Sequence, residues 1–131
     1  QLDPFSWQAV GMAWLLSEAR VLASIEVADS HADKLKGLLG RDHLDGALAL
    51  PGCKWVHTIG MRFPIDVAYE AADNTVIKAH TLARHRVGPP IRHAVMIIEA
   101  EAGAFERWGL KVGDPVEIRE STHESPVERS A

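Results

Sequence analysis

Three residues in segment 53–66 have side chains suited to chemistry: Cys53, His57 and Asp66. A thiol, an imidazole and a carboxylate are the residue types of thiol catalysis, in which histidine activates the cysteine and the acid orients the histidine. Each also has a structural interpretation. Cys53 can be a small apolar residue, His57 a neutral ring bonded to backbone or to Asp66, and Asp66 an acceptor of backbone N–H groups. We favour the structural roles and keep catalysis by these three residues as the alternative.

The stretch 56–61 alternates like a strand, which would place His57 beside Ile59 and Met61 on one face. A histidine in apolar surroundings can line a pocket, where it binds a ligand or transfers a proton. If His57 and Asp66 form one hydrogen-bonded unit, replacing both should give a non-additive loss of stability.

Basic side chains near this segment provide further candidates for ligand binding. Arg41 and Arg62 can instead pair with nearby aspartates, and the stiffened loop around Gly88 can present its arginines to solvent. The scattered histidines and the single cysteine match no metal-binding spacing, so we predict no metal and no cofactor. The candidate ligand-binding residues are Arg41, His57, Thr58, Arg62, Asp66, Arg84, Arg86 and Arg92.

Four short motifs occur in order along the chain. They are the loop 36–41; Pro51 and Cys53 leading into His57-Thr58, Gly60-Met61 and Pro64-Ile65-Asp66; Ile98-Glu99-Ala100 with Ala102-Gly103; and the turn 109–114. Together they resemble the bacterial and archaeal domain of unknown function 192 family, from about residue 20 to 118. The chain departs from the family pattern at Gly52 and in segment 83–92. The resemblance implies no particular activity, since none is established for that family.

Composition sets broad limits on the fold and its partners. A chain of 131 residues with 47% hydrophobic residues suits one domain with one core. The net charge of −4 argues against general nucleic-acid binding, which needs concentrated Lys and Arg. One cysteine cannot form an internal disulfide, and the apolar run 9–16 is too short to cross a bilayer. We expect a cytoplasmic protein, with an envelope or secreted location left open because the natural N-terminus can lie upstream.

The local patterns divide the chain into three parts. Residues 1–19 should form a helical extension, capped by Asp3 and Pro4, that is a candidate surface for self-association. Residues 20–120 should form the domain, and the polar tail 121–131 should be disordered. Within the domain, Ser30 should cap a helix that ends near Gly40 and buries Leu35, Leu38 and Leu39, and a short helix should span 104–108. Strands are expected at 21–27, 47–50, 56–61, 65–71, 75–82, 95–100 and 115–119.

Successive strands with few helices predict an α+β fold: a mainly antiparallel curved sheet or small β-barrel with two to three flanking helices. For function we predict a small binding or accessory domain, without catalysis, whose site lies around residues 53–66. Its partner would be an unknown small ligand or a protein. One alternative is a small enzyme that uses His57 and Asp66 with Cys53 as nucleophile. Another is a structural module that acts through the N-terminal helix.

Overall fold

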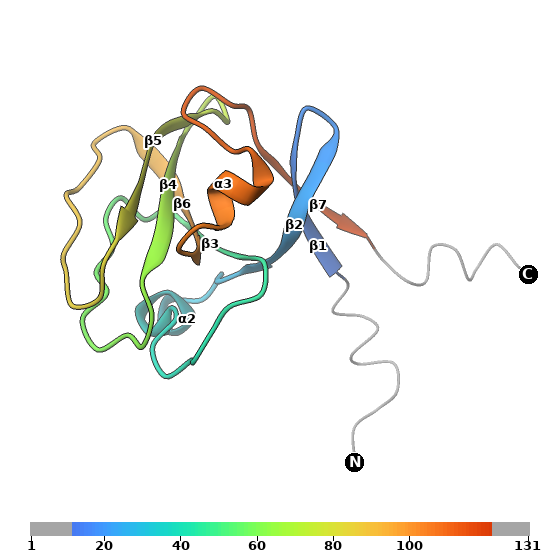
Figure 1. Ribbon diagram of the computed structural model, residues 1–131. Coiled ribbons are helices and arrows are strands. Elements are labelled where there is room, and N and C mark those ends of the chain that lie inside the picture. The colour runs from blue at the N-terminus through green and yellow to red at the C-terminus, as the bar shows by residue number, and fades with distance from the viewer. Residues whose placement is uncertain (1–11, 122–131) are drawn as a thin grey trace, which may run out of the picture.

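A computed structural model describes residues 12–121, which form a seven-stranded sheet with two short helices (Figure 1). The strand order across the sheet is β5-β4-β6-β3-β2-β1-β7. The elements are β1 (Met12–Ser17), β2 (Arg20–Val27), α2 (His31–Lys36), β3 (Ala47–Pro51), β4 (Ile65–Ala71), β5 (Val76–Leu82), β6 (Ala94–Glu101), α3 (Ala104–Trp108) and β7 (Glu117–Ser121).

The sheet is antiparallel except where β2 pairs in parallel with β3. Within residues 12–121 its order begins at β5 and finishes at β7, so the sheet is not closed and the barrel that the sequence allowed is not shown. The mainly antiparallel sheet was predicted correctly, and the helices beside it are few and short. β4 and β5 join through a tight hairpin in which Asn74 has a φ of 70°, as expected for a residue that tolerates left-handed backbone angles.

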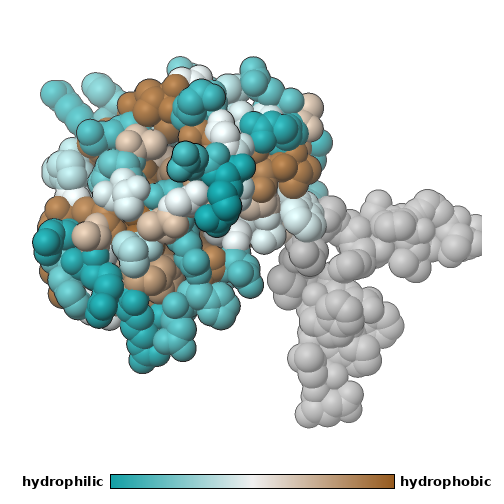
Figure 2. All heavy atoms as spheres, in the orientation of Figure 1, coloured by the Kyte–Doolittle hydropathy of each residue, from teal (hydrophilic) through white to brown (hydrophobic). Residues whose placement is uncertain are grey.

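Each face of the sheet covers a separate hydrophobic core. Ile65, Val67 and Tyr69 of β4 point to the first core together with Ile97 of β6, and α2 lies toward this side. The alternate residues of the same strands point to the second core, which the residues of α3 and β7 help to close. Figure 1 shows α3 in front of the sheet, with α2 at its lower end. In Figure 2, hydrophobic and hydrophilic residues are interspersed on this face of the molecule.

The start of α2 and the end of α3 follow their predicted cap residues. The Ser30 hydroxyl accepts a hydrogen bond of 3.0 Å from the Asp33 amide, and Gly109 ends α3 with a φ of 72°. α2 ends at Gly37 rather than near Gly40. The prediction that Leu35 is buried was wrong: its exposed fraction is 68%. Because α2 has fewer than two turns, Leu38 follows its end and reaches the core from the loop.

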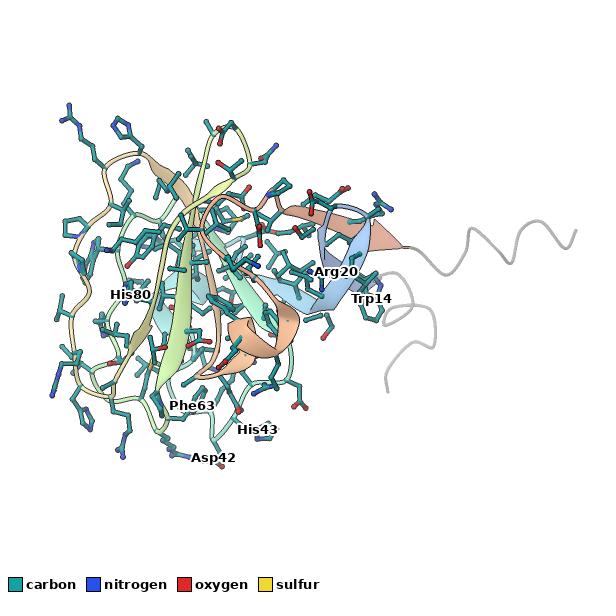
Figure 3. All side chains as sticks on the ribbon, turned by 45° about the horizontal axis from the view of Figure 1, so that its top comes forward. Trp14, Arg20, Asp42, His43, Phe63 and His80 are labelled. Atoms are coloured by element: carbon teal, nitrogen blue, oxygen red, sulfur yellow. The ribbon has the colours of Figure 1, made fainter. Side chains whose placement is uncertain are left out.

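The predicted N-terminal helix is wrong over residues 12–19. Residues 12–17 are β1, which pairs with β2 and with β7, and Leu15 is fully buried in the second core. Helical spacing of apolar residues misled the prediction because both faces of β1 contribute to packing, which hides the strand period. Figure 3 labels Trp14 and Arg20 in the β1–β2 hairpin, where the Arg20 guanidinium donates to the Trp108 carbonyl at 2.8 Å. The predicted cap at Asp3 and Pro4 and the tail beyond Ser121 lie outside the described residues.

The predicted strand at 56–61 is also wrong, because this segment is a loop. It runs beside the 83–91 loop, and backbone hydrogen bonds join Thr58 to Arg86 and Val56 to Gly88 at 2.8 Å each. The buried Thr58 hydroxyl donates to the Ala83 carbonyl and accepts from the Arg86 amide at 2.9 Å. Gly60, with a φ of 82°, turns the loop back toward Leu39.

Candidate functional site

A cavity of about 390 Å³ opens on the first-core side of the sheet. Its walls are α2 with the following loop and the segment between β3 and β4. This volume falls within the range of small-molecule sites in proteins. The apolar part of the lining consists of Leu35, Leu38, Leu39, Leu50, Val56 and Met61.

Glu99 of β6 contributes a carboxyl group to this cavity. It occupies a central strand, opposite Leu48 of β3 and Val67 of β4, and only 4% of the residue is exposed. Burial alone raises the pKa of Glu99 to about 7, with no hydrogen bond or neighbouring positive charge to lower it. Glu99 is therefore a buried acid without a partner among the described residues, and it faces the cavity.

Tyr69 of β4 lies near this acid on the same face of the sheet. Burial, and secondarily the negative charge of Glu99, raise the pKa of the Tyr69 hydroxyl. That hydroxyl lies 3.3 Å from Nε2 of His80, whose ring stacks on the tyrosine ring with centroids 5.7 Å apart. Figure 3 labels His80 on β5. The tyrosine thus has its own partner and leaves the Glu99 carboxyl unpaired.

Basic side chains of α2 surround the cavity on another side. Lys34, Lys36 and His31 all contribute to its lining. The Lys34 Nζ lies 3.7 Å from the position that a Cβ on Gly52 would occupy, so the lysine reaches across from α2 to the end of β3. Neither lysine takes part in the ion pairs found within residues 12–121. The cavity therefore combines an acid on the sheet with bases on the helix.

His57 and Cys53 also line this cavity, as does Trp55. The His57 Nδ1 accepts a hydrogen bond of 3.2 Å from the Ile59 amide, which leaves the N–H on Nε2 in the neutral ring. The ring centroids of Trp55 and His57 are 5.9 Å apart. The structure thus brings His57 and Cys53 together at one cavity.

Asp66 lies on the other side of the sheet. It alternates along β4 with Ile65 and Val67 of the first core, so its side chain points toward the second core. Its Oδ2 accepts from the amides of Gly103 and Phe105 at 3.0 Å each. Its Oδ1 accepts from the Thr81 hydroxyl at 2.7 Å. Asp66 therefore ties the start of α3 to β4, and it does not orient His57.

The candidate arginines lie outside the cavity lining. Arg41 forms two hydrogen bonds of 3.0 Å with the Glu26 carboxylate, and Arg62 pairs with Asp42 at 2.7 Å. Figure 3 labels Asp42 and His43 close to Phe63, where the loop between α2 and β3 meets the loop before β4. The Arg84 Nε donates to the Met61 carbonyl at 3.0 Å. Arg86 and Arg92 are exposed on the 83–93 loop, so the structure does not unite the eight candidates in one site.

A second buried acid, Glu70, lies at the far end of β4. Its exposed fraction is 4%, and its Oε1 has no hydrogen-bond partner among the described residues. Burial, with a smaller contribution from the charge of Asp73, raises the pKa of Glu70 to about 7. Glu70 is not part of the cavity lining, so it bears on stability rather than on the site.

Sequence reasoning missed the two kinds of charged residue that distinguish the cavity. Glu99 interrupts the apolar run of β6 between Ile98 and Ala100, and this interruption was the available signal. Lys34 and Lys36 resemble ordinary solvent-exposed helix residues, so nothing in the sequence set them apart. Only the way α2 packs near the end of β3 gives them a role in the lining.

Residues 12–121 contain no group of three or more His, Cys, Asp or Glu side chains arranged to hold a metal ion. In the same residues, no helix has the length and apolar character required to span a bilayer.

Comparison with known proteins identifies relatives of this fold. Residues 14–118 match the model of the DUF192 family, described as uncharacterized ACR. A crystal structure of a protein of unknown function from Novosphingobium aromaticivorans superposes with a TM-score of 0.67 at 21% identity, covering 81% of this chain and 83% of that one. A crystal structure described as a "putative transcription regulator" from Sinorhizobium meliloti gives the same TM-score and identity, covering 82% and 92%. At this identity, the likeness concerns the fold alone. No protein with a curated description matches the chain.

Proposed function

The chain belongs to the DUF192 family, and we propose that it is a small-ligand-binding domain whose site is the cavity between α2 and the β3–β4 segment. The observation that carries this proposal is the unpaired, buried Glu99 carboxyl facing the cavity. A buried acid without a partner weakens a fold, because the charged form loses its hydration and gains nothing in return. A ligand that donates a hydrogen bond to Glu99 would supply the missing partner.

The surroundings of Glu99 fit binding better than thiol catalysis. Leu38, Leu50 and Val56 give the cavity apolar walls that would bury the body of a small molecule. Cys53 and His57 share the cavity, but Asp66 is engaged with α3 on the opposite face. The acid that would orient the histidine in a catalytic arrangement is therefore held elsewhere.

A ligand library tested by thermal shift examines the proposal directly. A ligand present at about 100 times its Kd adds about 2.7 kcal/mol to the free energy of unfolding, which raises Tm measurably. We expect Leu39→Trp, which places an indole in the cavity, to abolish the shift. Leu22→Trp is the matched control, because Leu22 is also a half-buried leucine but packs against the second core. If no compound stabilises the protein, or if both variants retain the shift equally, the proposed site is wrong.

A further inference from the structure

We infer that the ligand of this cavity is a zwitterion with separated charges, in which an ammonium group pairs with Glu99 and a carboxylate pairs with Lys34 across an apolar spacer. The inference rests on the proposed function and specifies the ligand class. It derives from where the two charged groups lie along β3: Glu99 is opposite Leu48, whereas Lys34 reaches Gly52, four residues further along the chain, and Leu50 lines the cavity from a position between them.

The end of the cavity at Glu99 is suited to a positively charged group of the ligand. Glu99 is almost fully buried in the middle of the sheet, with no hydrogen bond or cation beside it among the described residues. A ligand ammonium would supply up to three N–H donors and the opposite charge to a residue that is only 4% exposed. Charge-assisted hydrogen bonds of this kind are the strong ones in proteins. A neutral hydroxyl or amide of a ligand would donate a hydrogen bond to Glu99 without the attraction between opposite charges, so it would bind the carboxylate less strongly.

The end of the cavity at Lys34 is suited to a negatively charged group of the ligand. The Lys34 ammonium reaches toward Gly52 at the end of β3, and Lys36 and His31 lie on the same short helix. Neither lysine is engaged in an ion pair within the described chain. A ligand with an ammonium alone would meet like charges here, whereas a ligand with a carboxylate at its other end would meet opposite ones.

The apolar walls between the two ends set the spacing of the ligand charges. Leu38, Leu39 and Leu50 line the cavity together with Val56 and Met61. An α-amino acid carries both charges on one carbon and would leave either Glu99 or Lys34 unmatched. A linear ω-amino acid places methylene groups along these walls and one charge at each end, so it matches all three features.

The test is an NMR titration of the full chain, followed through its ¹⁵N amide resonances at pH 8 and low salt. The probes are ε-aminocaproate, hexylamine and hexanoate, which carry both charges, only the ammonium and only the carboxylate. Glycine tests adjacent charges. We expect ε-aminocaproate to bind at least about tenfold more tightly than the other three, the equivalent of one charge-assisted hydrogen bond. The amides that shift should belong to α2, segment 52–61 and β6.

Two variants assign the charges. Glu99→Gln should weaken ε-aminocaproate and hexylamine by about tenfold or more and leave hexanoate unaffected. Lys34→Met, which keeps the alkyl stem, should weaken ε-aminocaproate and spare hexylamine. Lys78→Met, on the exposed part of β5, is the control for loss of a positive charge.

The inference is overturned if hexylamine or hexanoate binds as tightly as ε-aminocaproate, if glycine does so, or if Glu99→Gln leaves ε-aminocaproate binding unchanged. It is also overturned if none of the four probes shifts the cavity resonances. In that case, library ligands whose effect Leu39→Trp abolishes would keep the proposed function and reject the zwitterion. Absence of both probe and library binding would reject the cavity as a site altogether.

Discussion

Replacing Glu99 with glutamine should stabilise the free protein at alkaline pH and have little effect in acid. In the unfolded chain the carboxyl has its ordinary pKa of 4.5, whereas burial raises the pKa of Glu99 in the folded protein to about 7. Between these values the folded state binds more protons than the unfolded state, so stability falls as pH rises through this window. The difference corresponds to a penalty of about 3 kcal/mol, which is complete above pH 7 and absent below pH 4.5.

No group around Glu99 reverses this expectation. The titratable or basic side chains that share its face or its cavity are Tyr69, His80, Glu101, His31, Lys34, Lys36, Cys53 and His57. None of them forms a hydrogen bond with the Glu99 carboxyl, and burial is the one influence on its pKa. Burial also raises the pKa of Glu70 from 4.5 to about 7. Ionisation of both buried acids therefore lowers the stability of the parent protein as pH rises through this range.

The measurement is urea unfolding of the parent and Glu99→Gln at pH 5 and at pH 8. Since Glu70 is present in both proteins, its contribution cancels in the difference. We expect the free energy of unfolding of the variant to exceed that of the parent by about 1 kcal/mol or less at pH 5, and by about 3 kcal/mol at pH 8. Glu120→Gln, at an exposed position of β7, is the control and should give no such change with pH. The reasoning would be refuted if the free energies of unfolding of Glu99→Gln and the parent differed by the same amount at both pH values. It would also be refuted if the variant were less stable than the parent at pH 8.

Three further predictions concern the stability of the fold. Asp66→Asn should lower the free energy of unfolding in urea by about 1 to 3 kcal/mol, because it disturbs the acceptor of two amides at the start of α3. This loss should add to that of His57→Ala, since the two side chains lie on opposite sides of the sheet. A strong energetic coupling in the double mutant would contradict the geometry. Thr58→Val should cost about 1 to 3 kcal/mol and speed amide exchange in the 83–88 loop, with Thr58→Ser as the control that keeps the hydroxyl. Leu15→Ala should cost about 2 to 5 kcal/mol, whereas Leu35→Ala, on the exposed side of α2, should cost little; equal losses would contradict the packing.

The position of β1 revises what truncation should do. If residues 20–120 were the complete domain, removing residues 1–18 would leave a folded protein. β1 instead pairs with both β2 and β7, and Leu15 is fully buried. Removing β1 would expose one edge of each partner strand and open the second core. We therefore expect the truncated chain to lose cooperative unfolding, as measured by urea and by circular dichroism.

Local signals account for most of the elements that the sequence predicted correctly. β4 has the predicted bounds because Pro64 precedes it and the Asp73-Asn74 turn follows it, and α3 ends at Gly109 as its left-handed conformation requires. β1 and the 56–61 loop were wrong for a shared reason. Their conformation is decided by partners distant in sequence, the β7 strand and the 83–91 loop, which no local pattern reveals.

Only part of the candidate site could be predicted, because its grouping also depends on residues that are distant in sequence. His57 and Cys53 stood out because polar and reactive groups in an apolar setting are visible in a sequence. Asp66 stood out equally, yet strand alternation turns it toward α3, and the incorrect strand at 56–61 hid this separation from His57. The grouping of Glu99 with Lys34 depends on where α2 packs against the sheet, so it required the tertiary structure.

The stability and binding experiments constrain each other through one quantity, the cost of ionising Glu99 inside the sheet. A ligand ammonium would stabilise the ionised acid and recover part of the penalty that the free protein carries above pH 7. Glu99→Gln should therefore be more stable than the parent at pH 8 and bind ε-aminocaproate less tightly, an exchange of function for stability that is common at binding sites. A variant that gained stability without losing affinity would show that the ligand leaves Glu99 unpaired. A variant that lost affinity without gaining stability would show that the acid already has a partner in the free protein.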